Sequence, residues 1–285
     1  MRDPIVTEEQ ITEGLGAFDE LEYLGGGTFG DTYRAVRGDD EIALKVVHVE
    51  GLPDYLWKRE VEALRRVEHP NVVGFQSSGT FHSFARDYSY LICEYIDGGD
   101  VAAAIAAGRL PESTAEMVEL LTGLLAGVAE IHDLGILHRD IKPANVALRH
   151  SDWGQPVLLD FGLARLVDMS SHTELPAHIG TARYMAPEQL RGGAARRRSD
   201  LFAVAEVAYE AITGRHPFVP PGEAATLQAL HDRIRDQSPE PASTFNAASA
   251  PEIDGVLARL LSYRPHERLG ISAALKDMEQ IHGDV

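Results

Sequence analysis

The chain has 285 residues, 44% of them hydrophobic, which is enough for a large core in one domain of two lobes or in two small domains. Its net charge of −18 repels nucleic acid and anionic membranes, so neither is an expected partner. It has no apolar run of about 18 residues and no apolar signal core, and its single cysteine, Cys93, excludes an internal disulfide framework. These features predict a cytoplasmic protein. The acidic surface favours basic partners or substrates. The alternative is that the negative charge serves only to keep the protein soluble.

The first part of the chain is expected to be rich in strands. Residues 1–17 are polar and predict a flexible lead or an added strand. Residues 18–49 favour short strands, and the residues around Lys45 have the apolar composition of a buried strand. Apolar residues recur at helical spacing over 54–67, and strand-like runs return over 72–96.

Helices are expected to predominate in the second part. Asp100 is placed to cap a short helix, and a Ser-x-x-Glu capping box opens a long one over 113–132. Another apolar helix is expected over 200–212. Strands followed by helices predict an α+β chain, with a strand-rich part over 18–96 and a helical part over 97–285.

A glycine-rich run and a lysine lie in the strand-rich part. The run Gly25–Gly30 matches G-x-G-x-x-G, and glycines let backbone amides approach phosphate oxygens closely. The motif alone is weak, but a strand rather than a helix follows it, which favours a glycine flap over a dinucleotide fold. Lys45 lies fifteen residues after Gly30 in an apolar strand, where a lysine needs an anionic partner or reaches solvent at an edge.

The most specific pattern lies in the helical part. Residues 138–145 read His-Arg-Asp-Ile-Lys-Pro-Ala-Asn, and Asp160-Phe161-Gly162 begins fifteen residues after Asn145. A carboxylate, an ammonium and a carboxamide are thus close in sequence, and a second carboxylate precedes a glycine. Such a set can orient a hydroxyl nucleophile, neutralise a transferring phosphoryl group and hold Mg²⁺.

With these motifs the chain resembles the bacterial-type, eukaryotic-like serine/threonine protein kinases over about residues 18–280. The resemblance implies one bilobal kinase domain, with a lead over 1–17, an N-lobe over 18–96 and a C-lobe over 97–285. It also implies transfer of the γ-phosphoryl group of ATP to Ser or Thr hydroxyls of proteins. A pseudokinase scaffold with weak nucleotide binding and a small-molecule kinase of related fold are the alternatives. The oligomeric state, the substrate and the activating signal are not indicated.

The resemblance assigns the catalytic roles to four residues. Asp140 would accept or orient the proton of the substrate hydroxyl, and Lys142 would contact the γ-phosphate. Lys45 would contact the α- and β-phosphates and pair with Glu60, for which Glu62 is the competitor.

The same resemblance implies MgATP as the cofactor, with Mn²⁺ as an alternative ion. Asn145 and Asp160 would ligate the metal through oxygen atoms. The residues expected at the nucleotide are Gly25, Gly27, Gly30, Thr32, Ala43, Lys45, Glu94, Ile96, Asp100 and Ala147. Thr32 and Ala147 are more polar or smaller than the family's usual adenine contacts, so we expect modest ATP affinity.

Residues 180–188 resemble the end of a kinase activation segment. The resemblance implies an ion pair between Glu188 and Arg268, and an anchoring role for Asp200 beneath the backbone of the 138–145 loop. Glu206, in the apolar helix over 200–212, receives no role.

Control is expected in the activation segment. Arg139 and Arg165 could bind one phosphate there, which motivates a hypothesis of autophosphorylation. The candidate acceptors are Ser170, Ser171 and Thr173, and Thr181 is expected to hydrogen-bond near the catalytic residues.

Overall fold

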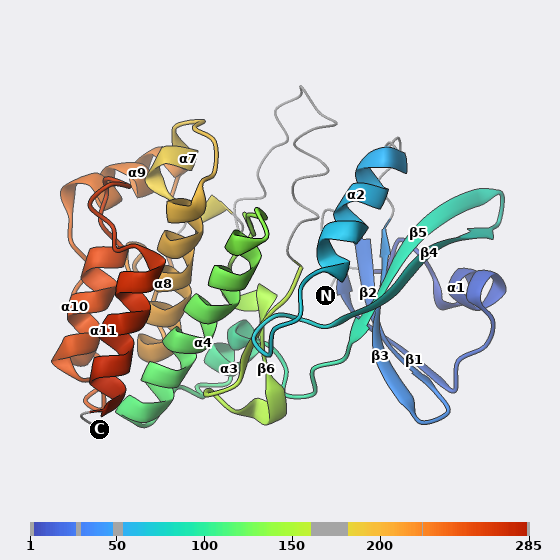
Figure 1. The fold of residues 1–285 in the computed structure, drawn as a ribbon, viewed down its shortest axis with the longest axis horizontal. Coiled ribbons are helices and arrows are strands. Elements are labelled where there is room, and N and C mark those ends of the chain that lie inside the picture. The colour runs from blue at the N-terminus through green and yellow to red at the C-terminus, as the bar shows by residue number, and fades with distance from the viewer. Residues whose placement is uncertain (1–2, 27–29, 48–53, 161–181, 224, 284–285) are drawn as a thin grey trace. The chain divides into compact units, whose positions relative to one another are not determined.

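The computed structural model of the chain describes residues 3–26, 30–47, 54–160, 182–223 and 225–283, without the side chains of Asp54, Leu56, Arg59 and Glu60. The described residues divide into two compact units (Figure 1). The smaller unit contains the residues up to His69 and Val73–Ile96, and the larger contains Pro70–Val72 and the residues from Asp97 onward.

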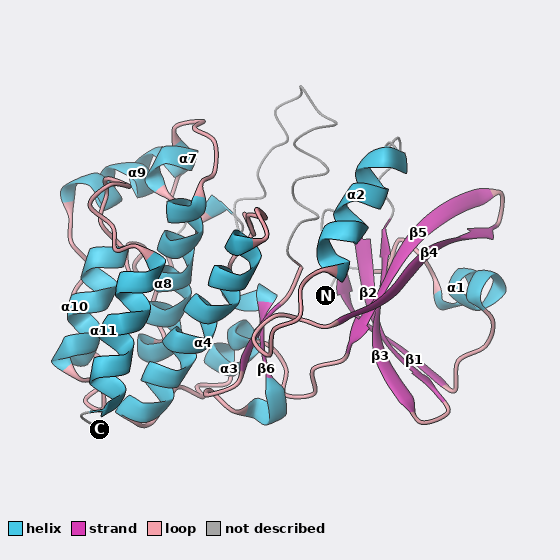
Figure 2. Ribbon diagram, viewed as in Figure 1, coloured by secondary structure: helices cyan, strands magenta, loops and turns pink. Residues whose placement is uncertain are grey.

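The smaller unit is built on an antiparallel sheet with the strand order β1-β2-β3-β5-β4 (magenta in Figure 2). Its strands are β1 (Glu20–Gly26), β2 (Gly30–Arg37), β3 (Asp40–Val47), β4 (Phe75–Ser83) and β5 (Arg86–Glu94). Two helices, α1 (Glu8–Leu15) and α2 (Asp54–Arg65), both contact β4.

The N-terminal segment differs from the expected flexible lead or added strand, because it forms α1. Thr7 caps the helix in a capping box with Gln10, and Ile11 is fully buried against the sheet. A helix this short gains most of its stability from docking, and it leaves too few turns for an apolar stripe to be recognised. The Thr-x-x-Gln pattern is the local signal that could have predicted it.

The larger unit is mostly helical. Its helices are α3 (Val101–Ala106), α4 (Thr114–Asp133), α7 (Pro187–Leu190), α8 (Arg197–Thr213), α9 (Leu227–Asp236), α10 (Pro251–Leu260) and α11 (Ile271–Gly283), with short 3-10 helices at Pro143–Asn145, Arg149–Ser151 and Ala242–Thr244. A hairpin of β6 (Val146–Leu148) and β7 (Pro156–Leu158) completes it.

Helix α4 forms the centre of this unit, since it packs against α8, α11 and β7. Its apolar residues Leu120, Leu121 and Leu124 are fully buried. The capping box over Ser113 and Glu116 fixes where α4 begins, as the sequence predicts. Within the described part of the chain, no helix combines the length and apolar composition needed to span a membrane.

Candidate active site

A buried aspartate of α8 holds the backbone of the 138–145 loop. The carboxylate of Asp200 is 2% exposed and accepts hydrogen bonds from the backbone N–H groups of His138 and Arg139, both at 3.0 Å. Its Oδ2 also lies 2.8 Å from Nε2 of His132 on α4. A buried carboxylate needs such partners, so the loop and the two helices are fixed to one another.

Asp140 lies at the centre of this loop. Its Oδ2 accepts hydrogen bonds from Lys142 Nζ at 2.9 Å and from Asn145 Nδ2 at 2.8 Å, and Asn145 Nδ2 also donates to the Asp140 carbonyl at 2.8 Å. Oδ1 is buried and has no hydrogen-bond partner among the described residues. One carboxylate oxygen is therefore fixed in place, and the other is available to accept a proton from a ligand hydroxyl.

His138 supports the loop as a neutral side chain. It is fully buried, and burial lowers its pKa although the carboxylates of Asp200 and Asp140 favour the charged form. The backbone N–H of Asp140 donates to His138 Nδ1 at 3.4 Å. The imidazole is therefore part of the packing beneath Asp140.

Two residues of this region have left-handed backbone conformations, Arg139 with φ of 68° and Asp160 with φ of 56°. Non-glycine residues rarely adopt such angles, which cost about 1–3 kcal/mol each and tend to occur at functional sites. The bond from the Arg139 N–H to Asp200 helps to hold the first of these conformations.

The β6–β7 hairpin brings Asn145 and Asp160 to the same end of two paired strands. Asn145 precedes β6, Asp160 follows β7, and the N–H of Leu159 donates to the Asn145 carbonyl at 2.9 Å. Because Asp140 uses the amide nitrogen of Asn145, the amide oxygen is the atom left to ligate a cation. An amide oxygen and a carboxylate form the hard donor set that suits Mg²⁺.

In the smaller unit, one face of the sheet carries the residues expected at the nucleotide. Lys45 lies opposite Thr32 on β2 and opposite Leu91 on β5, and Ala43 lies opposite Cys93. Opposed residues of antiparallel strands share a face, as do alternate residues of one strand. Thr32, Ala43 and Lys45 therefore face the same side.

The glycine run shows why its last position must be glycine. A Cβ on Gly30 would overlap the backbone oxygen of Val46, so no larger residue fits at the start of β2. Gly25 has φ of 154°, at the margin of the range that favours glycine. Gly27 lies outside the described residues.

Hydrogen bonds join Glu94, in the segment expected to bind adenine, to Gly74, the residue before β4. The backbone N–H of Glu94 donates to the Gly74 carbonyl at 2.9 Å, and the Gly74 N–H donates to Glu94 Oε1 at 2.8 Å. Ile96, two residues on, is buried. Contacts of Glu94 and Ile96 with adenine stay predictions.

Asp100 serves as a helix cap, which was one of its two expected roles. Its Oδ1 accepts a hydrogen bond from the Ala103 N–H at 2.7 Å at the start of α3. The backbone of Asp100 also bridges to that of Ala147, which is buried. The ribose contact of Asp100 and the adenine contact of Ala147 stay predictions.

Several predicted residues lie outside what the structure describes. The side chain of Glu60 is among them, so its pairing with Lys45 stays a prediction, and the competitor Glu62 is exposed. The residues expected to control activity are also outside the described ranges, apart from Arg139: Arg165, Ser170, Ser171, Thr173 and Thr181.

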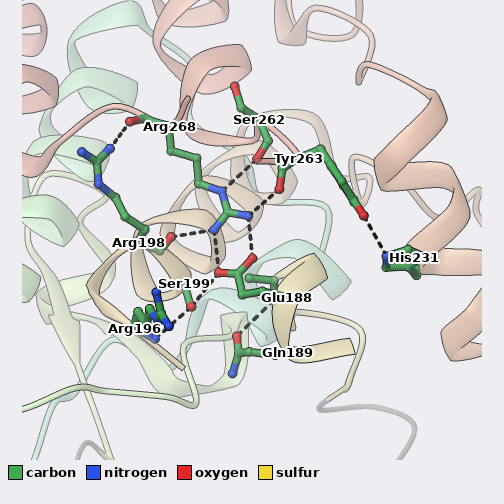
Figure 3. A network of polar contacts seen from close by, with 10 residues as sticks. Glu188, Gln189, Arg196, Arg198, Ser199, His231, Ser262, Tyr263 and Arg268 are labelled. Atoms are coloured by element: carbon green, nitrogen blue, oxygen red, sulfur yellow. Dashed lines mark hydrogen bonds and ion pairs between the residues drawn. The ribbon is translucent and has the colours of Figure 1, made fainter. Parts of the chain in front are cut away.

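A bidentate ion pair joins α7 to the segment before α11 (Figure 3). Arg268 donates two hydrogen bonds of 2.8 Å to the Glu188 carboxylate, and Ser199 Oγ donates a third at 2.7 Å. The guanidinium also donates to the carbonyls of Arg198, Ser262 and Tyr263. Burial alone would raise the pKa of Glu188, but the bonds from Arg268 and Ser199 outweigh it and hold the pKa below its ordinary value.

The sequence did not predict a second polar cluster, around Glu206. This side chain is fully buried, and neither carboxylate oxygen has a hydrogen-bond partner among the described residues. His216 Nε2 lies 3.6 Å from its Oε1 and 3.0 Å from the Arg183 carbonyl. His216 Nδ1 accepts a hydrogen bond from the Phe218 N–H. The proton of the neutral ring is therefore on Nε2, which donates a hydrogen bond to the Arg183 carbonyl.

The sequence profile of the family described as "Protein kinase domain" matches residues 18–278. A probable serine/threonine-protein kinase of Streptomyces coelicolor is 33% identical over 263 residues, which cover 89% of this chain and 38% of that protein. The serine/threonine-protein kinase PknB of Mycobacterium leprae is 30% identical over 92% of this chain and 42% of its own length. The chain thus spans about two fifths of the length of these relatives.

A solved structure agrees with the fold. The crystal structure of the Mycobacterium tuberculosis PknI kinase domain, determined on a point mutant, matches with a TM-score of 0.63 and 25% identity, over 93% of this chain and 96% of that one. The expected α+β kinase fold, with a strand-rich unit and a helical unit, is confirmed. The chain therefore belongs to the protein kinase family, as a bacterial-type, eukaryotic-like serine/threonine member.

Proposed function

We propose that this chain transfers the γ-phosphoryl group of ATP to serine or threonine hydroxyls of protein substrates. The observation that carries the proposal is the different surroundings of the two carboxylate oxygens of Asp140. Lys142 and Asn145 hold one of its carboxylate oxygens, and the other is buried without a hydrogen-bond partner in the described residues. A carboxylate held in this way is suited to orient a hydroxyl and to receive its proton.

In this reaction a bond forms between the substrate oxygen and the γ-phosphorus, and the bond from that phosphorus to the β–γ bridging oxygen breaks, which leaves ADP. Asp140 Oδ1 accepts the hydroxyl proton. Lys142, already within reach of Asp140, adds positive charge beside the transferring group. Lys45 and the glycine run over 25–30 bind the other phosphates, with Glu60 as the partner of the lysine.

The donor set of Asn145 Oδ1 and the Asp160 carboxylate fits a hard divalent cation, for which Mg²⁺ is the first choice and Mn²⁺ the alternative. The ion would supply neutralisation of phosphate charge. The positions of Asn145 and Asp160 at one end of the β6–β7 hairpin support this assignment.

The nature of the substrates and the control of activity extend the proposal. The net charge of −18 favours basic protein substrates. Autophosphorylation at Ser170, Ser171 or Thr173 would make the chain a phosphoprotein. Arg139 and Arg165 would bind the added phosphate. A single cysteine supports a reducing, cytoplasmic setting.

The test is transfer of radiolabelled γ-phosphate from MgATP to the chain itself and to a panel of proteins and small alcohols. We expect label on proteins with the wild type, and a loss of about 10²-fold or more with Asp140→Asn and with Lys45→Met. Asp152→Asn is the matched control, because the exposed side chain of this aspartate accepts hydrogen bonds from Gly154 and Gln155 of its own turn. Mass mapping of the labelled chain tests the sites over 170–173.

Each alternative function has its own outcome in this experiment. Nucleotide binding by the wild type without transfer to any acceptor would favour the pseudokinase scaffold. Label on the small alcohols but not on proteins would favour a small-molecule kinase. Equal transfer by the wild type and Asp140→Asn would contradict the role of Asp140.

A further inference from the structure

The N-terminal segment is built into the smaller unit although it precedes the family match, which begins at residue 18. Val6 and Ile11 are fully buried in a cluster with Tyr33 and other apolar residues of the sheet. A Cβ on Gly14 would overlap the ring of Phe81, so α1 lies directly against β4. We call residues 5–15 the clamp.

Three polar contacts of the clamp reach the first residues of β2, while Gln10, Glu13 and Leu15 contact Tyr88, Ser83 and Arg37 elsewhere on the sheet. The backbone N–H groups of Ile5 and Val6 both donate to Asp31 Oδ2, at 2.6 and 2.9 Å, and the Tyr33 hydroxyl donates to the Val6 carbonyl. Asp31 and Tyr33 are fully buried. Hydrogen bonds to an ionised acceptor are stronger than neutral ones, so these bonds fix the position of the strand more firmly than apolar packing alone.

Asp31 directly follows Gly30, the last glycine of the glycine run proposed to bind phosphate. Side chains alternate along β2, so Asp31 points to the clamp while Thr32 lies opposite Lys45 on the other face. Gly30 also packs closely against the Val46 backbone. A displacement of Asp31 would therefore shift both Gly30 and the backbone of β2 opposite Lys45.

We propose that the clamp acts through Asp31 to position Gly30 and the start of β2, and that it sets the affinity for the nucleotide rather than the rate of transfer. Asp31 is a positioning residue, since it acts through Gly30 and the backbone of β2. This inference rests on the proposed function, because the start of β2 is assumed to lie at the phosphates of ATP.

The test compares Asp31→Ala with Asp31→Asn in the full chain, with KM for MgATP and kcat measured separately. We expect KM to rise about tenfold in Asp31→Ala, the equivalent of one hydrogen bond to a charged acceptor, with kcat nearly unchanged. Asp31→Asn keeps an oxygen that can accept both backbone N–H groups, so it should restore most of the affinity. Tyr33→Phe, which removes the bond to Val6, should raise KM by a smaller factor.

Asp254→Ala is the matched control for loss of a structural aspartate. Asp254 accepts the Ser243 backbone N–H at 3.1 Å in the larger unit, so its loss should lower stability and leave KM for MgATP unchanged. If Asp31→Ala does not fold, Tyr33→Phe and Ile11→Val give the same readout.

The possible outcomes distinguish a failure of the clamp proposal from a failure of the proposed function. An active wild type with equal KM values in all folded clamp variants overturns the clamp alone, as does an Asp31→Asn variant as weak as Asp31→Ala. A fall in kcat at unchanged KM also overturns it. A wild type that neither binds nor uses MgATP overturns both proposals, whereas a raised KM that asparagine restores supports both.

Discussion

Two glutamates of the larger unit, Glu188 half-buried and Glu206 fully buried, have opposite surroundings. Glu188 receives two hydrogen bonds from Arg268 and one from Ser199 (Figure 3), whereas both oxygens of Glu206 lack a hydrogen-bond partner in the described residues. His216 lies 3.6 Å from Glu206, but burial and the charge of Arg183 lower the pKa of His216 to about 3, so it is neutral. Burial by itself therefore does not decide the charge of a carboxyl group in this chain.

Some of the charges around Glu206 raise its pKa and others lower it. Burial first and then repulsion by Glu210 raise the pKa of Glu206 well above its ordinary value, against the attraction of Arg268 and Arg183. Burial likewise raises the pKa of Glu210, although the Tyr184 hydroxyl donates to it at 2.8 Å. Two carboxyl groups one helical turn apart on α8 thus both have pKa values raised above the ordinary value of a glutamate.

The two glutamates should make stability depend on pH in opposite ways. The lowered pKa of Glu188 contributes stability that is present above about pH 4.3, the ordinary value of a glutamate, and is lost as the pH falls through the folded-state value. The raised pKa of Glu206 contributes stability that is present below about pH 4.3 and is lost as the pH rises through its folded-state value. Near neutral pH, Glu188 therefore stabilises the fold and Glu206 destabilises it.

The largest effect is expected when the paired carboxylate loses its cation. Arg268→Ala leaves Glu188 partly buried without its cation and removes the donor to three backbone carbonyls. The contact of the guanidinium with the Phe202 ring, 4.7 Å away, is lost as well. We expect the free energy of unfolding, measured by urea denaturation at pH 7, to fall by about 3–5 kcal/mol.

An exposed ion pair provides the control for this change. Arg259 lies 2.9 Å from Asp277, and its side chain is 59% exposed. Arg259→Ala should cost about 0–1 kcal/mol, because water already solvates both groups. Similar losses in the two variants would mean that the burial of the Glu188 pair has no energetic weight.

Removal of the charge at Glu206 should change the free energy of unfolding in the opposite direction. Glu206→Gln keeps the shape of the side chain but removes the cost of a buried ionisable group, so we expect a gain of about 1–2 kcal/mol at pH 8. The gain should shrink toward pH 4, where Glu206 is mostly protonated in the unfolded chain as well as in the folded one. The measurement is a series of urea denaturation curves between pH 4 and pH 8.

Glu279→Gln is the comparison for this series, since Glu279 is an exposed residue of α11. Its free energy of unfolding should follow that of the wild type at every pH. A gain in Glu206→Gln that is constant over the whole range would show that packing, rather than charge, separates glutamate from glutamine at this position.

The contrast between the two glutamates also shows what could be predicted from the sequence. Glu188 and Arg268 belong to recognisable motifs, so their pairing followed from the family resemblance. The class of the fold followed from local signals such as the capping box of α4. The residues of the 138–145 loop are neighbours in sequence, which is why they could be expected to lie in one place.

The surroundings of Glu206 could not be predicted in the same way. Helix α8 is buried on nearly every side from Ser199 to Thr213, so no apolar stripe shows which face meets which neighbour. His216 follows the helix after the turn at Gly214, and its contact with Glu206 depends on how that turn folds back. The docking of α1 likewise depends on Asp31, which is distant in sequence.

The smallest effect is expected at Ser199, the residue of the Glu188 network that the motifs did not reveal. Its hydroxyl donates to Glu188 Oε1 at 2.7 Å and accepts the Arg196 N–H at 3.0 Å. Ser199→Ala should cost about 1 kcal/mol at pH 7, because Arg268 still holds the carboxylate. It should also bring the pKa of Glu188 closer to its ordinary value, so the loss should diminish as the pH falls through that range. An equal loss at pH 3 and pH 7 would assign the cost to the Arg196 contact instead, and would leave Arg268 as the group that keeps Glu188 ionised.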